Sequence, residues 1–190
     1  MRVIGGQAKG LRLRAVPGDR TRPITDRVKQ ALFDILGPEV VGARFLDLFA
    51  GTGSVGIEAL SRGADWAVFV ERHTAALRII RQNLETTHLS HRAEVIGADV
   101  FAFLARPEGA GQPYDLVYVA PPQYQGLWAD TLQALDARLS TWLAPDGLVV
   151  VQLFPKEYTP LVLESLMLTE RRDYGSTTLC FFEPVAHTNT

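Results

Sequence analysis

From about residue 43 onward, short apolar runs alternate with segments of helical periodicity. The runs are rich in Val, Phe, Leu and Ile, and most lack polar alternation, which is typical of strands buried on both faces of a sheet. Alternation of strands and helices predicts an α/β fold with a parallel, doubly wound sheet and right-handed crossovers. The expected strands are Arg44–Ala50, Trp66–Glu71, Ala93–Asp99, Tyr114–Ala120 and Gly147–Phe154.

Helices and an edge hairpin complete the expected order of elements. Leu127–Leu143 carries bulky apolar residues three and four positions apart, which predicts one amphipathic helix. Near the N-terminus, Thr25 is placed to cap a helix over Asp26–Leu36, which Gly37 and Pro38 would end. Near the C-terminus, Leu168–Tyr174 and Thr177–Glu183 flank Gly175-Ser176, as in an antiparallel hairpin at a sheet edge.

The chain length of 190 residues predicts a single domain over residues 1–190, with a core over residues 43–184. No stretch approaches the roughly 20 apolar residues that a membrane span needs. The N-terminus lacks the apolar core of a signal peptide, and the only cysteine, Cys180, lies in an apolar run typical of core packing. We therefore expect a cytoplasmic protein, monomeric and without a membrane partner.

Charge is distributed unevenly along the chain. Residues 1–30 hold eight basic and two acidic side chains, whereas the remaining 160 hold 11 basic and 19 acidic ones. A basic N-terminal arm, taken here as residues 1–38, on an acidic body is a footprint expected for a polyanionic partner. A solvated, partly disordered arm would give the same charge pattern.

A glycine-rich turn follows the first expected strand. Gly51, Gly53 and Gly56 match G-x-G-x-x-G, and a helix is expected at Ile57–Arg62. Residues without side chains let a backbone approach a nucleotide-like ligand at a helix N-terminus. The motif alone also fits nicotinamide and flavin cofactors.

Three acidic residues narrow the choice of ligand. Asp47 lies four residues before Gly51, where it would repel a pyrophosphate and attract an ammonium group. Glu71 ends the second strand, where an acid chelates ribose hydroxyls, and Asp99 ends the third strand, near the expected place of an adenine amino group. S-adenosylmethionine has an ammonium, a ribose and an adenine but no phosphate, so these positions favour it. The alternative is that the three acids are turn residues at strand ends.

The fourth expected strand ends in Ala120-Pro121-Pro122-Gln123-Tyr124. Two prolines cannot continue a sheet ladder. In an open α/β sheet the ligand crevice lies beyond the carboxyl ends of the strands. This segment is therefore expected to face the reactive end of the cofactor.

At these motifs the sequence resembles the RsmD-like methyltransferases, bacterial enzymes that modify guanine N2 in 16S ribosomal RNA of the small subunit. The resemblance covers nearly the whole chain. It includes the Arg22-Pro-Ile-Thr-Asp-Arg-Val segment, the Leu46-Asp-Leu-Phe-Ala-Gly-Thr-Gly loop and the Asp115-Leu-Val-Tyr-Val-Ala-Pro-Pro strand end. It implies a Rossmann-like sheet of seven strands, mostly parallel with one antiparallel strand.

The resemblance also implies a cofactor site and an RNA-binding arm. Residues expected at the S-adenosylmethionine site are Asp47, Phe49, Ala50, Gly51, Gly53, Glu71, Arg72, Asp99 and Val100. Residues expected to engage the ribosomal RNA or an assembling 30S particle are Arg2, Lys9, Arg12, Arg14, Arg22, Thr25 and Arg27. No metal is expected, because the positive sulfonium drives methyl transfer and the four histidines form no ligand pattern.

One residue departs from the family's pattern. The family motif reads Asp or Asn, then Pro-Pro and an aromatic residue, whereas this chain has Ala120 before the prolines and Gln123 before Tyr124. Acceptors on both N–H groups of an exocyclic amine direct its lone pair toward the methyl group. Pro121 keeps the backbone acceptor, and Ala120 lacks the side-chain one. Gln123 is a candidate replacement acceptor, and Tyr124 is placed to stack on an exposed base.

Two hypotheses follow. The protein either retains methyl transfer with Pro121 and Gln123 as acceptors, or binds cofactor and RNA with little turnover. An adenine-N6 nucleic-acid methyltransferase would use the same turn, but most of those enzymes carry a recognition domain that 190 residues leave no room for, so no DNA partner is expected. A nicotinamide dehydrogenase would share the glycine loop but not Asp47. A cytosine-C5 enzyme needs a Pro-Cys nucleophile that Cys180 does not provide.

Overall fold

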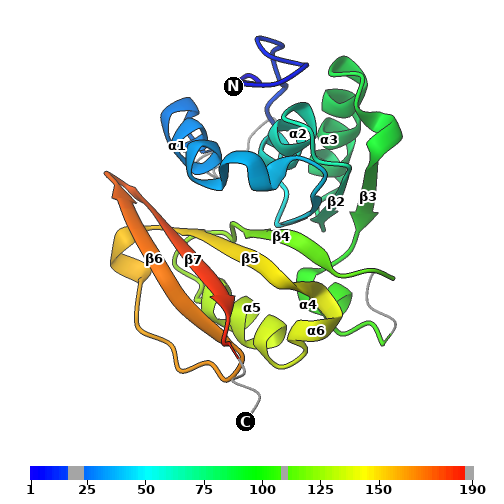
Figure 1. Cartoon of the computed structure of the whole chain (residues 1–190). Coiled ribbons are helices and arrows are strands. Elements are labelled where there is room, and N and C mark those ends of the chain that lie inside the picture. Colours follow the sequence, from blue (N-terminus) through cyan, green and yellow to red (C-terminus); the bar gives the residue numbers. More distant parts are fainter. Residues whose placement is uncertain (17–23, 108–110, 187–190) are drawn as a thin grey trace.

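The computed structural model describes residues 1–16, 24–107 and 111–186 (Figure 1). The described strands form one seven-stranded sheet in the order β3-β2-β1-β4-β5-β7-β6. All neighbouring pairs from β3 to β5 are parallel, whereas β7 runs antiparallel to both β5 and β6. This confirms the predicted fold class. The strands are β1 (Arg44–Leu48), β2 (Trp66–Glu71), β3 (Ala93–Gly97), β4 (Tyr114–Val119), β5 (Leu143–Leu153), β6 (Leu166–Tyr174) and β7 (Thr177–Pro184).

Helices cover both faces of the sheet (Figure 1). On one face lie α1 (Asp26–Leu36), α2 (Ser54–Ser61) and α3 (Thr74–Thr86), and on the other lie α4 (Val100–Leu104), α5 (Leu127–Asp136) and α6 (Leu139–Trp142). Short 3-10 turns occur at Gly37–Val40, Ser90–Arg92 and Pro155–Glu157. No helix in the described ranges is long and apolar enough to cross a membrane.

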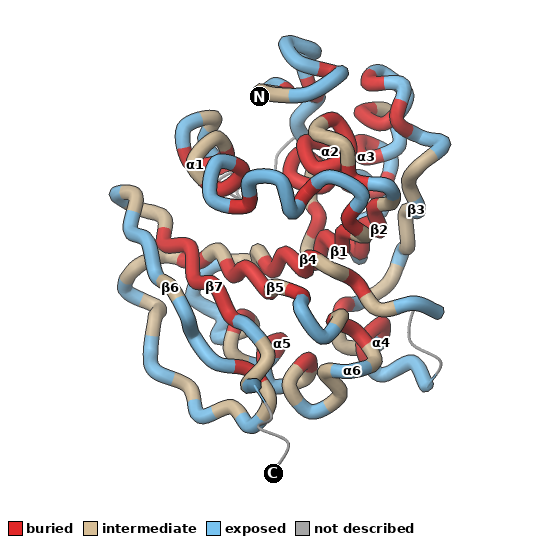
Figure 2. The backbone as a smooth tube through the Cα atoms, viewed as in Figure 1, coloured by how far each residue is buried: buried red, intermediate tan, exposed pale blue. Residues whose placement is uncertain are grey.

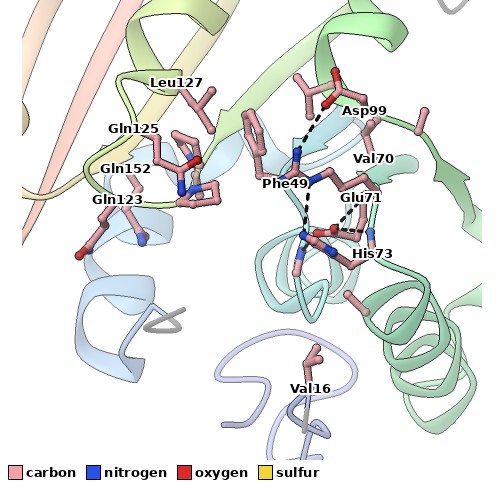
Figure 3. A pocket seen from close by; sticks show the side chains of 18 of the residues that line it. Val16, Phe49, Val70, Glu71, His73, Asp99, Gln123, Gln125, Leu127 and Gln152 are labelled. Carbon is pink, nitrogen blue, oxygen red and sulfur yellow. Dashed lines mark hydrogen bonds and ion pairs between the residues drawn. The ribbon is translucent and has the colours of Figure 1, made fainter. Parts of the chain in front are cut away.

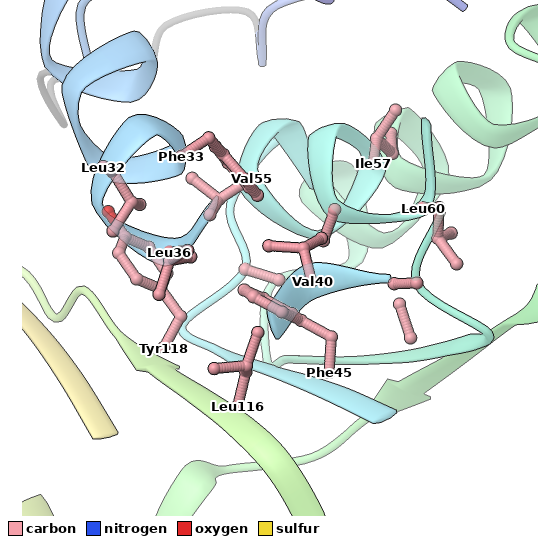
Figure 4. Packing of buried hydrophobic residues seen from close by; sticks show 14 of the residues in the cluster. Leu32, Phe33, Leu36, Val40, Phe45, Val55, Ile57, Leu60, Leu116 and Tyr118 are labelled. Carbon is pink, nitrogen blue, oxygen red and sulfur yellow. The ribbon is translucent and has the colours of Figure 1, made fainter. Parts of the chain in front are cut away.

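Two buried clusters follow from this layering (Figure 2). The first fills the space between the sheet and α1 to α3. There Phe45 and Leu116 of adjacent strands meet Leu32 and Leu36 of α1 (Figure 4). Residues one position along each strand face the second cluster, under α4 to α6, because successive side chains of a strand point to opposite faces.

The central strands β2 and β4 are buried almost throughout, as their unbroken apolar sequences predict. The same expectation is wrong for β3. It lies at the edge of the sheet beside β2 alone, and none of its residues is fully buried. Several expected strand ends also shift: β1, β3 and β4 end one or two residues earlier, and β5 begins at Leu143.

The continuous helix expected over Leu127–Leu143 is wrong, since α5 ends at Asp136 and α6 begins at Leu139. Arg138 leaves the helical region, with φ −139° and ψ 38°. Its guanidinium donates hydrogen bonds to the carbonyls of Leu104 and Arg106, at 2.9 Å each. The break lets Trp142 enter the core beside Phe103, with ring centroids 4.9 Å apart. The helix expected at Ile57–Arg62 starts three residues earlier, at Ser54.

Candidate active site

A cavity of about 660 Å³ lies beyond the carboxyl ends of the parallel strands. Glu71 and Asp99 lie on one side, Gln123 and Gln125 on the other, and Phe49 between them (Figure 3). This size is within the range of ligand pockets, roughly 300–1,000 Å³. Predicted site residues that line the cavity are Phe49, Gly51, Glu71, Arg72, Asp99, Val100, Ala120, Pro121, Pro122, Gln123 and Tyr124. Asp47, Ala50 and Gly53 do not line it.

The backbone amides of the glycine-rich turn already have acceptors inside the protein. Gly51 N–H donates to Glu71 Oε2 at 3.0 Å, and Gly53 N–H to the Ala50 carbonyl at 2.7 Å. Gly56 N–H donates to Asp47 Oδ2 at 3.0 Å. In a phosphate-binding loop such amides point at the ligand. The turn is therefore suited to a cofactor without phosphate groups.

The three glycines serve different purposes. A Cβ on Gly56 would lie 2.4 Å from the Phe69 ring, and one on Gly53 would lie 3.2 Å from Ile80. Both glycines let α2 and the turn pack against β2 and α3, which is a structural role. A Cβ on Gly51, which has φ +54° and lines the cavity, would meet only the Phe49 carbonyl oxygen, at an ordinary contact distance of 3.9 Å. Only Gly51 fits the expected reason, close approach of the backbone to a ligand.

Asp47 lies beneath the turn instead of in the cavity, with 2% of its surface exposed. Its carboxylate accepts the Gly56 N–H near the N-terminus of α2, where a negative charge is favourable. Burial nevertheless raises the pKa of Asp47 to about 8, and the nearby Glu71 adds to that rise. The sequence predicts that Asp47 attracts a ligand ammonium, but Asp47 does not line the cavity. Asp47 supports the turn from below.

Glu71 is held by three backbone amides. Its Oε2 accepts from Gly51 at 3.0 Å, and its Oε1 accepts from Arg72 and His73 at 2.8 Å each. A carboxylate offers about four acceptor positions. One position on Oε2 therefore remains for a ligand hydroxyl at the cavity wall. The three amides fix the orientation of the carboxylate before any ligand arrives.

Asp99 can serve both roles that the sequence left open. Its Oδ1 caps α4 by accepting from the Phe101 and Ala102 amides at 2.9 and 3.4 Å. Its Oδ2 lies 3.9 Å from Arg72 Nη1, and both side chains are about half exposed at the cavity. Asp99 is thus a turn residue whose second oxygen can still accept from a ligand amine.

Two cavity residues adopt the left-handed backbone conformation that is uncommon outside glycine. Phe49 has φ +62° and Tyr124 has φ +60°. Such strain costs of order 1–3 kcal/mol and clusters at functional sites. The Tyr124 amide donates to Glu157, and its ring lies 5.5 Å from the Phe154 ring while 68% of the residue stays exposed. The Tyr124 ring is therefore supported on one side and available on the other.

The N-terminal arm packs on the same helix that begins at the glycine-rich turn. Glu58 of α2 is fully buried and accepts the amides of Ile4 and Gly5 at 2.8 and 2.7 Å. Lys29 Nζ lies 3.2 Å from Glu58 Oε2 and donates to the Arg2 carbonyl at 2.7 Å. Burial lowers the pKa of Lys29, and the adjacent Glu58 opposes that shift. Lys29 therefore adds nothing to the exposed positive charge that the sequence counted in the arm.

Asn83 of α3 joins the arm to the turn. It accepts from Arg14 N–H at 2.8 Å and donates to the carbonyls of Arg14 and Thr52 at 3.1 and 2.9 Å. Val16, two residues further on, lines the cavity (Figure 3). Sequence reasoning missed Asn83 and Glu58. The sequence signal for both was a polar residue on an otherwise apolar helix face.

The residues expected to bind RNA lie mostly on the exposed surface of the arm. The side chains of Lys9, Arg12, Arg14 and Arg27 are exposed, and none of them forms an ion pair with another described residue. Arg2 pairs with Asp26 at 3.1 Å, and a β-bridge places it opposite Arg12. Thr25 caps α1 as expected, accepting from Val28 N–H at 3.3 Å. Arg22 lies outside the described residues.

Ten further cavity residues were not foreseen as site residues from the sequence, namely Val16, Val70, His73, Ala75, Ala76, Ala98, Gln125, Leu127, Gln152 and Leu153. His73 lies two residues after Glu71, so its closeness to a predicted acid was visible in the sequence. Gln152 lies near the end of β5, the strand next to β4. Its place at the cavity depends on strand order, which the sequence pattern did not specify.

Comparison with known proteins gives concordant results. A family model described as Conserved hypothetical protein 95 matches residues 1–183. Ribosomal RNA small subunit methyltransferase D of Escherichia coli (strain K12) is 38% identical over 152 residues, which are 80% of this chain and 74% of that protein. YlbH of Bacillus subtilis (strain 168) is 35% identical over 183 residues, 96% of this chain and 98% of that one. The solved structure of yhhF from Escherichia coli has a TM-score of 0.84 at 34% identity, over 97% of both chains.

Proposed function

The chain belongs to the RsmD-like family of ribosomal RNA methyltransferases, and on this premise we propose that it methylates the exocyclic N2 of a guanine in small-subunit ribosomal RNA, with S-adenosylmethionine as methyl donor. One observation carries the proposal. A single cavity brings the Ala120–Tyr124 segment together with Glu71 and Asp99. The donor and the acceptor base would thus meet at the same strand ends.

The residues present fit this cofactor. Glu71 keeps one acceptor position for a ribose hydroxyl, and Asp99 Oδ2 is available to an adenine amine. The amides of Gly51, Gly53 and Gly56 are satisfied internally, which disfavours a pyrophosphate. When bound, the cofactor supplies an electrophilic methyl group: the amine lone pair forms the new N–C bond, the electrons of the S–C bond stay on sulfur, and one amine proton leaves to water.

The chain's own groups orient the base. The Pro121 carbonyl accepts one amine N–H, and the exposed face of the Tyr124 ring stacks on the base. Preorganised polar groups at a reacting centre contribute on the order of 10²–10³ in rate each. The exposed arginines of the arm bind phosphates of the RNA backbone, which gives affinity without sequence selection.

Calorimetry and a transfer assay test the function. We expect S-adenosylmethionine to bind and NAD not to bind; binding of NAD alone would exclude a methyltransferase. Methyl transfer is then measured on small-subunit particles that lack the modification, with wild type, Ala120→Asp and Ala120→Asn. Turnover by the wild type supports the proposal.

Ala120 specifically favours a second candidate, a protein that binds cofactor and RNA with little turnover. The residue lacks the side-chain acceptor that the family motif supplies at this position. The same assay separates the two candidates. Turnover that appears only after Ala120→Asp or Ala120→Asn would establish the binding-only function.

A further inference from the structure

The amine in the proposed reaction has two N–H groups, and the Ala120 side chain can accept neither. The Pro121 carbonyl serves one of them. A donor left unpaired on binding costs roughly 1–3 kcal/mol. An active enzyme therefore needs a second acceptor near the end of β4.

The neighbouring strand places a side chain at this point. β4 and β5 are parallel, and their last paired residues are Val119 with Val151. β4 ends at Val119, and the same register continued by one residue would place Ala120 next to Gln152. Ala120 packs against the same buried cluster as Tyr118 and Val150, and the two-residue period of a strand places Gln152 on that face. Gln152 also lines the cavity (Figure 3).

Tyr118 fixes the orientation of the Gln152 amide. The Tyr118 hydroxyl donates to Gln152 Oε1 at 2.5 Å. Tyr118 is 3% exposed and lies beside Leu32 and Leu36 of α1 (Figure 4). Burial raises the pKa of Tyr118 well above its ordinary range, so the hydroxyl stays protonated and remains a donor. The ring cannot swing away without disturbing the packing of α1.

The contact with Tyr118 leaves most of the Gln152 amide unused. A carbonyl oxygen has two lone pairs and an amide nitrogen has two N–H groups. Among hydrogen bonds between described residues, only the one from Tyr118 engages the Gln152 side chain. One acceptor position on Oε1 and two N–H donors on Nε2 therefore remain at the cavity.

Gln123 is less well placed for the same task. It is exposed on the turn after the prolines, and no hydrogen bond from another described residue orients its amide. An acceptor that must be ordered on binding loses side-chain entropy, whereas Gln152 is ordered beforehand.

We infer that Gln152, positioned by Tyr118, is the second acceptor for the substrate amine and pairs with the nucleobase edge that Ala120 leaves unread. Gln152 Oε1 accepts one N–H of the guanine N2 amine, and Nε2 donates to the adjacent ring nitrogen N3. An amide matches such an amine beside a ring acceptor, as glutamine does with the N6/N7 edge of adenine. This inference rests on the proposed function.

The kinetic test compares matched glutamine-to-leucine changes. We expect Gln152→Leu to lower kcat about 10²-fold or more with cofactor affinity nearly unchanged, while Tm falls because the buried Tyr118 hydroxyl loses its acceptor. Gln133→Leu, at an exposed position of α5, should leave kcat unchanged. Tyr118→Phe should lower kcat about tenfold, and adding Ala120→Asn to Gln152→Leu should restore turnover. A larger loss from Gln123→Leu than from Gln152→Leu would overturn the inference.

A binding test without turnover uses guanosine, inosine and adenosine in the presence of S-adenosylhomocysteine. Inosine lacks the N2 amine. We expect guanosine to bind wild type about five- to tenfold more tightly than inosine, and this preference to vanish in Gln152→Leu. A preference that survives the substitution, or none in wild type, contradicts the role of Gln152; stronger binding of adenosine than of guanosine contradicts the guanine edge. If the preference depends on Gln152 but wild type transfers no methyl group, the proposed function fails while the pairing of Gln152 with the guanine edge stands.

Discussion

At the scale of single residues, Asp47 shows that the role of a carboxylate depends on how deeply it is buried. Its carboxylate lies under the glycine-rich turn, with a pKa of about 8 against an ordinary value of 3.8. The folded protein thus holds this proton more tightly than the unfolded chain does. Its contribution to stability is complete below about pH 4 and declines as the pH rises toward 8.

Replacement of Asp47 tests this dependence. Asparagine does not ionise and keeps an oxygen for the Gly56 N–H. We therefore expect Asp47→Asn to remove the decline, so that its Tm gains on wild type between pH 5 and pH 8. Thermal unfolding without cofactor at several pH values measures this. Parallel curves of Tm against pH would contradict the raised pKa.

The glycines of the turn give a second residue-scale prediction. Gly56→Ala places a Cβ 2.4 Å from the Phe69 ring, and overpacking of this kind costs about 1–3 kcal/mol in the free energy of unfolding. Gly51→Ala meets no atom closer than the Phe49 carbonyl oxygen at 3.9 Å and costs only backbone strain, about 1–2 kcal/mol, but its methyl group enters the cavity. Denaturant unfolding and calorimetry with S-adenosylmethionine separate the two effects. Loss of cofactor affinity should be larger for Gly51→Ala; the reverse order would contradict the assigned roles.

At the scale of elements, the arm, α1 and α2 form one unit around a buried carboxylate. Glu58 receives Lys29 from α1, Arg62 at 2.8 Å from its own helix, and two amides from the arm. Removal of one partner of a buried ion pair typically costs 3–5 kcal/mol. Because Glu58 keeps its other contacts, we expect the loss of Lys29 to cost an amount near the lower end of this range.

A matched pair of lysine substitutions tests this unit. Lys29→Met is expected to lower the free energy of unfolding by about 3 kcal/mol, because Glu58 stays buried with less compensation. Lys9→Met, on the exposed surface of the same arm, should change it by less than about 0.5 kcal/mol. Equal effects in urea unfolding would show that burial does not distinguish the two lysines.

At the scale of the whole molecule, the exposed arginines of the arm lie on the α2 and α3 side, and β6 forms the far edge of the sheet (Figure 1). Binding to single-stranded nucleic acid loses affinity with salt at a slope of about 0.7 per neutralised phosphate. We expect the double change Arg12→Ala and Arg14→Ala to reduce this slope by about 1–1.5. Arg172→Ala on β6 is the control and should leave it unchanged. An unaltered slope in the double variant would show that Arg12 and Arg14 do not neutralise phosphates, as expected for an arm that is only solvated.

The arm also shows what the sequence could and could not predict. Its helix was predictable, because Thr25, Gly37 and Pro38 are local signals. That Lys29 is buried was not, since its partner Glu58 lies 29 positions away and meets it only after α1 docks on α2. The excess of positive charge counted in residues 1–30 therefore overstates what the surface presents.

The sequence by itself determined the strand and helix alternation and the turns that follow β1, β2 and β4. It also determined that those turns share one edge, because parallel strands align their carboxyl ends. Only the tertiary structure decided which atoms face the cavity. Asp47 is beneath the turn and Gln152 meets Tyr118 at the cavity because strand register and helix packing, set by residues far apart in the chain, fix side-chain positions that no local pattern specifies.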